Sequence, residues 1–324
     1  MHIIDRYLDL INGTYYGLTV IYPETVRENF RPPFLIDLRD SIGDLLVNND
    51  YYWMEILSIA LCIQLLIIIR YLFCDKFIVN LLLRYRLIYG HDYHRFGHNL
   101  WNCLFYSHTF VISLLIMIEI GCMENPDRLW DNNDDDGHIA IMIKYLYLID
   151  ISNYIYATIH LIINYQRQWD LDSPMMIIHH IAAIILLILS HMINMHRMGV
   201  AIIYLLEISE VFYFLRCIIK IQLPIVQRWK NLIRLIGFTT MCLVWLYNRL
   251  YRYPLIILVS AIDFGYERLI LIDTIAIYIF IYYLLLLIQI FNIYWSIILI
   301  KLIIHICRRG LEQLEDVREI RCQK

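Results

Sequence analysis

The chain has 324 residues, of which 60% are hydrophobic and 18% charged, and its formal net charge is −3. Soluble domains average about 25% charged residues, so this composition excludes an ordinary soluble protein. The near-neutral charge gives no support for a nucleic-acid partner. Eight cysteines are scattered without CxxC spacing, which argues against a disulfide framework or a zinc site.

Seven apolar stretches, each near the roughly 20 residues that cross a bilayer, divide most of the chain. They are 51–73, 99–121, 141–165, 174–194, 199–219, 231–250 and 269–301. We therefore predict an all-α polytopic membrane protein with about seven transmembrane helices. Residues 1–50 are expected to form an N-terminal segment with an amphipathic helix near 34–47 and a glycosylation sequon at Asn12. Residues 74–98 are expected to form a linker, and residues 302–324 a charged tail.

The orientation follows from where lysine and arginine collect. Basic residues follow the first stretch, lie between the fifth and sixth, and return in the tail, whereas the acidic loop 124–136 holds a single arginine. We therefore expect a luminal N-terminus, a cytoplasmic linker at 74–98 and a cytoplasmic C-terminus.

Four ionisable residues interrupt the fourth and fifth stretches. His179 and His180 are adjacent, and Glu207 and Glu210 lie one helical turn apart. Charged groups inside a membrane cost several kcal/mol unless they face a protein interior or a watery cavity, so they are functional candidates. In the expected orientation all four lie in the cytoplasmic half, the histidines roughly 8–9 Å and the glutamates roughly 13–18 Å deep. These residues predict an acid–base centre that a cytoplasmic donor and a bilayer lipid can both reach.

Structural roles for the same residues stay open at this point. The histidines could hydrogen-bond between helices, and Glu207 and Glu210 could pair with Arg197 or Arg216. The two histidines and two glutamates would also suit a metal ion, but the sequence lacks repeated HxxH boxes, so no metal is expected. A transporter would need glycine or proline at mid-span, and these are scarce.

Further motifs surround the histidine pair in a fixed order. Their residues are Trp101 with Phe105–Tyr106, the run Asp150 to Tyr154, the linker Arg167 to Asp170, Ser190 with His191, Asn194, Arg197 and Gly199, the run Leu206 to Glu210, and Arg249–Leu250 with Tyr253–Pro254. This series resembles the Lag motif of ceramide synthases, within the wider TLC-domain family. Glutamates stand at Glu207 and Glu210 where the family has aspartates, an aspartate at Asp150 where it has glutamate, and His191 where it has tyrosine.

The resemblance implies a fold and an activity. It implies a six-helix bundle over residues 99–301 around a central cavity, with the first helix peripheral. Ceramide synthases transfer a fatty acyl group from acyl-CoA to the amine of a long-chain sphingoid base in the endoplasmic reticulum membrane. The implied partners are therefore acyl-CoA as co-substrate, a sphingoid base, membrane lipids and a second subunit in a homo- or heterodimer, with no cofactor. The alternative is a non-catalytic TLC-domain protein that binds lipid or associates with a translocon.

The resemblance also implies residue roles. His179, His180, Glu207 and Glu210 are the expected catalytic group, in which one imidazole acts as a base or as a nucleophile. The carboxylates would either orient a histidine or hold the substrate ammonium. The expected substrate-binding residues are Trp101, Tyr106, Asp150, Ser190, Asn194, Arg197 and Arg249.

Overall fold

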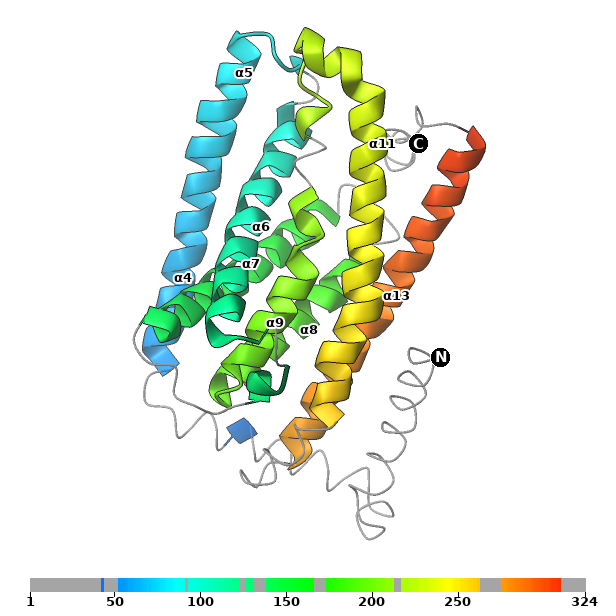
Figure 1. The fold of residues 1–324 in the computed structure, drawn as a ribbon. Coiled ribbons are helices and arrows are strands. Elements are labelled where there is room, and N and C mark those ends of the chain that lie inside the picture. Colours follow the sequence, from blue (N-terminus) through cyan, green and yellow to red (C-terminus); the bar gives the residue numbers. More distant parts are fainter. Residues whose placement is uncertain are drawn as a thin grey trace.

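A computed structural model describes residues 42–43, 52–90, 93–122, 126–130, 138–165, 173–212, 217–262 and 275–309. Several predicted features lie outside these ranges: the N-terminal segment apart from residues 42–43, the sequon at Asn12, most of the acidic loop, the linker Arg167 to Asp170 and the tail beyond 309. The described residues form helices and turns without any strand (Figure 1). The predicted all-α fold is confirmed.

Long helices run side by side as one bundle (Figure 1). In chain order the elements are α4 (Tyr52–Ile69), the π-helical η2 (Arg70–Val79), α5 (Asn80–Arg84), α6 (Tyr93–Ile120), the 3₁₀ turn η4 (Pro126–Trp130), α7 (His138–Tyr165), α8 (Ser173–Met192), α9 (His196–Glu207), the 3₁₀ turn η5 (Glu210–Phe212), α11 (Pro224–Leu246), the π-helical η6 (Tyr247–Arg252) and η7 (Pro254–Leu258), and α13 (Ile275–Arg309). Helix α7 packs against α4 and α8, α9 packs against α6, and α13 packs against α8.

Within the described ranges, five helical segments have the length and apolarity needed to cross a bilayer. They are Met54–Arg84, Phe96–Ile120, His138–Ile163, Pro174–Met192 and Ile277–Arg308. The expected fifth stretch is the short helix α9, and the expected sixth is α11 with its π-helical continuation. The polytopic architecture is thus established, and the count of seven spans stays a prediction.

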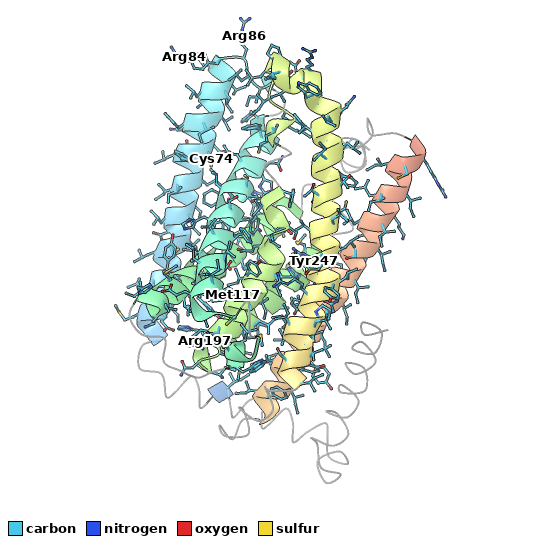
Figure 2. All side chains as sticks on the ribbon, in the orientation of Figure 1. Cys74, Arg84, Arg86, Met117, Arg197 and Tyr247 are labelled. Atoms are coloured by element: carbon cyan, nitrogen blue, oxygen red, sulfur yellow. The ribbon has the colours of Figure 1, made fainter. Side chains whose placement is uncertain are left out.

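The expected linker 74–98 is mostly helical. The first helix continues through η2 and α5 as far as Arg84, and α6 already begins at Tyr93. The reason lies in the sequence, because residues 77–83 are apolar apart from Asn80 and contain no glycine or proline. Arg84 and Arg86 therefore lie beyond the apolar part of the helix, at one end of the bundle (Figure 2).

Two helix ends depend on a left-handed backbone. Gly121, with φ of 73°, follows the last residue of α6, and Asn194, with φ of 58°, lies in the tight turn between α8 and α9. Glycine reaches this conformation without strain, and asparagine is the next most tolerant common residue. At the start of α11, Pro224 occupies the first turn, where its missing N–H is not needed.

The helix that begins as α11 becomes π-helical around Pro254. A proline inside a helix removes one backbone hydrogen bond and clashes with the preceding turn. The wider turns of η6 and η7 lie on either side of Tyr253, immediately before that proline. Segment η6 carries the buried side chain of Arg249, whose contacts are described below.

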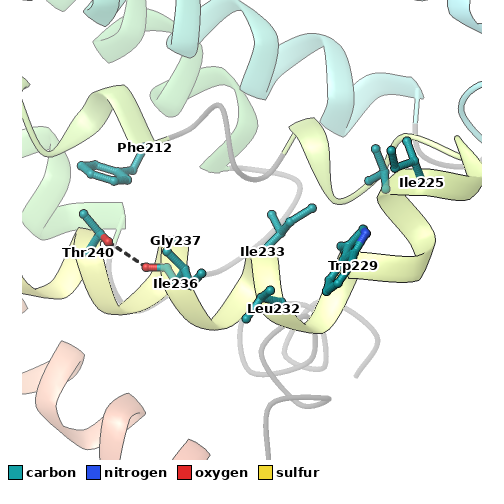
Figure 3. Close-up of a pocket in the computed structure, with 9 residues that line it drawn as sticks. Phe212, Ile225, Trp229, Leu232, Ile233, Ile236, Gly237 and Thr240 are labelled. Carbon is teal, nitrogen blue, oxygen red and sulfur yellow. Dashed lines mark hydrogen bonds between the residues drawn. The ribbon is translucent and has the colours of Figure 1, made fainter.

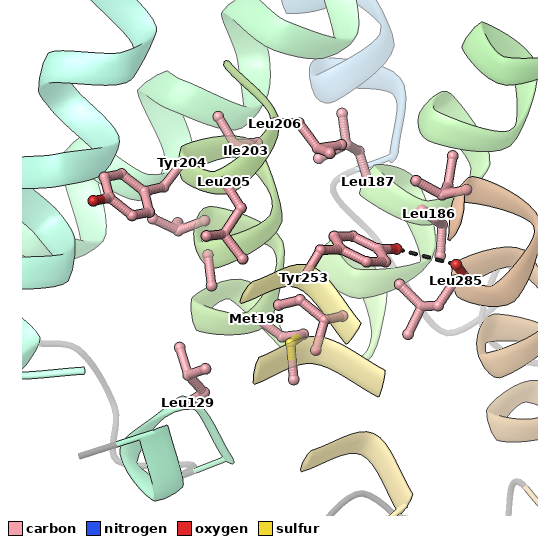
Figure 4. Packing of buried hydrophobic residues seen from close by; sticks show 14 of the residues in the cluster. Leu129, Leu186, Leu187, Met198, Ile203, Tyr204, Leu205, Leu206, Tyr253 and Leu285 are labelled. Atoms are coloured by element: carbon pink, nitrogen blue, oxygen red, sulfur yellow. Dashed lines mark hydrogen bonds between the residues drawn. The ribbon is translucent and has the colours of Figure 1, made fainter. Parts of the chain in front are cut away.

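The main core surrounds α9, where every residue from Met198 to Glu207 except Ile202 is buried. Figure 4 shows part of this cluster, including Leu186 and Leu187 of α8, and a hydrogen bond of 3.1 Å from the Tyr253 hydroxyl to the Leu285 carbonyl. Inside a bilayer the hydrophobic effect does not drive helices together, so close packing and such hydrogen bonds hold the bundle.

Helix α4 packs much less. In the continuous helical segment Met54–Arg84 that α4 begins, only 6% of the most apolar part is buried, and α4 presents an exposed apolar face that includes Leu57, Leu61 and Leu65. Lipid chains are the natural solvent for such a face. This arrangement agrees with the expected peripheral position of the first helix.

Candidate active site within the bundle

The two adjacent histidines of α8 lie inside the bundle and face different neighbours. His179 is 7% exposed and His180 is 8% exposed, and their ring centroids are 6.0 Å apart. Successive residues of an α-helix point about 100° apart, which explains why the two rings meet different helices. Neither imidazole has a carboxylate partner among the described residues.

His179 faces the aromatic side chains of α13. Its ring meets Trp295 edge-on at 5.0 Å between centroids and Phe291 edge-on at 5.8 Å. Its Nδ1 is buried and has no hydrogen-bond partner within the described residues. The orientation of this ring therefore depends on packing.

His180 faces helix α7 instead. Its ring lies edge-on to Tyr154 at 5.4 Å between centroids, and its Nδ1 lies 3.3 Å from the hydroxyl oxygen of Thr158. The two histidines thus occupy unlike surroundings, one aromatic and one hydrogen-bonded.

A pair of carboxyl groups lies at another level of the same bundle. Asp150 of α7 is 1% exposed and Glu207, the last residue of α9, is 2% exposed. The two carboxyl groups are near enough to influence each other electrostatically, but none of their oxygens has a resolved hydrogen-bond partner among the described residues. No lysine or arginine in the described part of the chain forms an ion pair with either group. Two buried acids without a cation are costly inside a membrane protein, and a cationic ligand bound beside them would lower that cost.

Glu210 has a different environment, because its charge is balanced within the protein. The guanidinium of Arg249 donates from Nη2 to Glu210 Oε1 at 2.7 Å, and the side chain of Arg249 is only 5% exposed. The predicted alternatives were Arg197 and Arg216; the first donates to the Arg128 carbonyl at 3.1 Å, and the second lies outside the described ranges.

Every nitrogen of the Arg249 guanidinium has a hydrogen-bond acceptor within the protein. Nε donates to Ser209 Oγ at 3.2 Å, Nη1 to Asn292 Oδ1 at 3.2 Å, and Nη2 to the Leu206 carbonyl at 2.9 Å. The guanidinium carbon lies 3.9 Å from the ring centroid of Trp245. The structure therefore uses Arg249 to join η6, the end of α9 and α13, rather than leaving it open for a substrate.

Three other predicted substrate-binding residues lie at the far end of α8. Ser190 follows His180 by ten residues, about 15 Å along the helix axis. Its hydroxyl contacts the Tyr147 hydroxyl at 3.0 Å, while Asn194 is exposed in the turn and Arg197 contacts Arg128. These residues are not brought to the histidines, and their contact with a substrate stays a prediction.

The predicted aromatic residues of α6 pack between neighbouring helices. Trp101 is buried beside Phe105, with ring centroids 6.0 Å apart, in a cluster with Cys74 of η2. Tyr106 lies edge-on to Phe105 at 5.6 Å. Their contacts tie the first helix to the bundle.

The residues that sequence reasoning missed are Tyr154 and Thr158 of α7 and Phe291 and Trp295 of α13. One signal was available for the first pair, because Asp150, Tyr154 and Thr158 follow one another at single-turn spacing on a helix that is otherwise largely apolar. The α13 aromatics gave no such signal, because aromatic residues are frequent throughout the chain.

The chain has 26 tyrosines, 13 phenylalanines and 7 tryptophans. With aromatic residues this frequent, no pattern in the sequence singles out Phe291 and Trp295. Their role is visible only once α13 is packed against α8.

Two apolar hollows lie near the site. An interior cavity of about 60 Å³ between α8, α9 and α13 is bordered by Tyr154 and Leu206 and extends past Met198 to Trp130. An open cleft of about 580 Å³ lies between η5 and α11 and is lined by Phe212, by Ile233 and Ile236, and by other apolar side chains (Figure 3). Of these two, only the interior cavity is lined by residues of α8, the helix that carries the histidines, and Ala183 is one of them.

Histidine, cysteine, aspartate and glutamate side chains are the usual ligands of a metal ion. Within the described ranges, no three histidine, cysteine, aspartate or glutamate side chains are grouped closely enough to hold an ion.

Comparison with known proteins agrees with the motifs. The sequence profile of the TLC domain matches residues 95–301. Human ceramide synthase 1 is 26% identical over 227 residues, which cover 68% of this chain and 63% of the relative. Ceramide synthase 1 LOH3 of Arabidopsis thaliana is 24% identical over 277 residues, covering 77% and 85%. The ASC1-like protein of Solanum lycopersicum is 24% identical over 235 residues, covering 69% and 73%.

The match thus spans less than two thirds of the length of the human relative. The resemblance predicted from the Lag-type motifs is nevertheless confirmed, because several of the relatives are ceramide synthases. The matched region is well over half of the chain and contains the histidine pair, the carboxyl pair and Arg249. The chain therefore belongs to the TLC-domain family.

Proposed function

We propose that this protein is a ceramide synthase, which transfers a fatty acyl group from acyl-CoA to the amine of a long-chain sphingoid base. The observation that supports this most strongly is the combination of two buried imidazoles, His179 and His180, with a buried carboxyl pair that has no cation of its own. This combination suits a lipid that carries an amine. The similarity to proteins named ceramide synthase supports the same activity.

The reaction needs one proton acceptor at the amine. The amine nitrogen attacks the thioester carbonyl carbon, a C–N bond forms, and the C–S bond breaks. An imidazole takes the proton that the nitrogen loses, and that proton then goes to the departing thiolate to give free CoA. Alternatively, an imidazole first accepts the acyl group and then passes it to the amine. Both routes need a neutral imidazole, and the buried surroundings of His179 and His180 favour the neutral form in either case.

The carboxyl pair is the proposed site for the substrate ammonium, which gives one proton to a carboxylate there and so becomes the neutral amine that attacks. Neither histidine contacts a carboxylate in the described structure, so a role in orienting a histidine has no support there. Glu210 is already paired with Arg249, which leaves Asp150 and Glu207 as the acids that still lack a counter-charge. Tyr154 lies between the two levels, in contact with His180 and within electrostatic range of both acids.

The interior cavity is the proposed path for a hydrocarbon chain. It begins beside Tyr154 and Leu206 and is lined almost entirely by apolar side chains. Its volume of about 60 Å³ is small, so a bound chain would displace flexible residues such as Met198. We assign no preference between the acyl chain and the chain of the sphingoid base.

We also propose an endoplasmic reticulum location, with the end that carries Arg84 and Arg86 facing the cytoplasm. Acyl-CoA would then reach the histidines from the water-soluble side, and the sphingoid base from the surrounding bilayer lipids. Acyl-CoA is a co-substrate, and no further cofactor is proposed. A homo- or heterodimer is compatible with the exposed faces of α4, which in a monomer meet lipid.

The test is N-acyltransferase activity of the purified protein in detergent, with sphinganine and acyl-CoAs of several chain lengths. Ceramide and free fatty acid are both quantified. Substitution of His179→Ala or His180→Ala is expected to lower ceramide formation by about 100-fold or more, the usual contribution of a general base. The matched control is His108→Ala, since His108 is exposed and its Nε2 lies 2.9 Å from the Tyr145 hydroxyl, away from both histidines of the pair.

Three outcomes separate the hypotheses. Ceramide from the wild type that is lost in both histidine variants and kept in His108→Ala supports the enzyme. Full activity in either histidine variant removes that histidine from the mechanism. A wild type that elutes as a folded species but makes no ceramide contradicts the proposal and favours the non-catalytic TLC-domain protein.

A further inference from the structure

Thr158 contacts one of the two histidines and has no role in the predicted site. It lies on α7 one turn after Tyr154, and only 9% of its surface is exposed. Its hydroxyl oxygen makes two contacts, at 2.7 Å to the Tyr154 carbonyl oxygen and at 3.3 Å to Nδ1 of His180. These two contacts together determine where the hydrogen atoms lie.

The hydroxyl of Thr158 has a single proton. A carbonyl oxygen only accepts, so the short contact to the Tyr154 carbonyl uses that proton. Towards His180 the same oxygen can then act only as an acceptor, and Nδ1 must carry the hydrogen. A neutral imidazole has one N–H, so Nε2 of His180 is left with its lone pair free.

His179 has no comparable constraint. Its Nδ1 lacks a hydrogen-bond partner within the described residues, and its ring is bounded by Phe291 and Trp295. The protein therefore fixes the tautomer of one histidine of the pair and leaves the other to its packing. Such a fixed tautomer matters when one particular nitrogen has to receive a proton.

We propose that Thr158 is a positioning residue that holds His180 in the Nδ1–H tautomer, with Nε2 as the proton acceptor. The inference rests on the acyltransferase function proposed above. As the amine forms its C–N bond and the C–S bond breaks, the amine proton moves to Nε2 and from there to the CoA thiolate. Thr158 continues to accept from Nδ1–H while His180 carries the extra proton, so this hydrogen bond persists before and after the proton transfer.

The experiment compares two substitutions at this position. Thr158→Val keeps the shape and removes the hydroxyl, whereas Thr158→Ser keeps the hydroxyl. We expect kcat of Thr158→Val to fall by about 10- to 100-fold, the size of effect typical of groups that orient a functional imidazole, with KM for both substrates little changed. Thr158→Ser should keep most of the activity.

The matched control is Thr240→Val. Thr240 is exposed on α11 and makes the same backbone contact, to the Ile236 carbonyl at 2.8 Å (Figure 3). Its substitution should leave kcat unchanged. A wild-type kcat in Thr158→Val, or an equal loss in both Thr158 variants, would overturn the inference while leaving the acyltransferase proposal intact.

A second measurement does not depend on activity. The ¹⁵N spectrum of histidine-labelled protein, with the His180 signals assigned through His180→Gln, reports which ring nitrogen carries the hydrogen. We expect a protonated Nδ1 in the wild type and in Thr158→Ser, and a mixture of tautomers in Thr158→Val. A protonated Nε2 in the wild type contradicts the inference, whether or not the protein makes ceramide.

Discussion

At the residue scale, the ionisable side chains divide into those with a partner inside the protein and those without one. Glu210 has Arg249, while Asp150 and Glu207 lie near each other without a basic partner among the described residues. The sequence predicted the four central residues because histidine and glutamate are rare in apolar helices. It did not predict Arg249 as the partner of Glu210, because the two lie 39 residues apart and only the packing of η6 against α9 joins them.

Arg249→Met should destabilise the fold. The substitution leaves the half-buried Glu210 carboxylate without its donor and the Leu206 carbonyl with Ser209 alone, a loss of about 1–3 kcal/mol. We expect a lower melting temperature in detergent. The double variant Arg249→Met/Glu210→Gln should recover part of the loss, since no uncompensated charge then remains.

The neighbouring Arg252 provides the control for this prediction. Its guanidinium makes a hydrogen bond of 3.5 Å to the Tyr204 hydroxyl, and it has no carboxylate partner in the described structure. Arg252→Met should therefore melt close to the wild type. If Arg249→Met also melts like the wild type, the four-contact arrangement around its guanidinium does not stabilise the bundle.

At the element scale, helix α9 is the piece that the sequence predicted least well. Residues 199–219 were expected as one span, but the α-helix ends at Glu207 and the short turn η5 follows, while residues 213–216 lie outside the described ranges. Apolar composition alone does not show where a helix stops. In this case the end coincides with the Leu206 carbonyl, which accepts from Arg249 and from Ser209 instead of continuing the helix.

Close packing of α9 against α7 and α8 depends on Gly199. A Cβ at this position would overlap the Tyr147 hydroxyl and would lie 2.7 Å from its Cζ and 3.2 Å from Ser190 Oγ. Gly199→Ala should therefore push the helices apart and destabilise the protein by about 1–3 kcal/mol, seen as a lower melting temperature. Tyr147→Leu in the same background should restore part of the stability.

Gly90→Ala is the matched control, because a Cβ at Gly90 would meet nothing within 4 Å. It should melt like the wild type. Equal melting temperatures for Gly199→Ala and Gly90→Ala would mean that α9 has room for a side chain and that the close approach is unimportant.

At the scale of the whole molecule, composition and motif order were enough to predict an all-α membrane bundle of the TLC-domain family. They were not enough to predict which helices touch. Asp150 and Glu207 meet because α7 and α9 are brought together inside the bundle, and the spacing of residues along the chain does not contain that information. The orientation in the membrane stays a prediction from the distribution of basic residues.

Glycosylation mapping in eukaryotic cells tests that orientation. In an Asn12→Gln background, a new sequon in the acidic loop 124–136 should be glycosylated, because this loop is expected in the lumen. A sequon placed beside Gly90, next to Arg84 and Arg86, should stay unmodified. The reverse pattern would place the basic end in the lumen and the proposed access for acyl-CoA on the wrong side.

The burial of His179 and His180 has a further consequence, which concerns water rather than lipid. An acyl thioester reacts with water as well as with amines, and a base that activates one nucleophile can activate the other. Side chains that are 7% and 8% exposed leave little room for bulk water beside the imidazoles. For the proposed reaction, the same enclosure that makes the charged groups costly would protect the activated acyl group from hydrolysis until a lipid amine arrives.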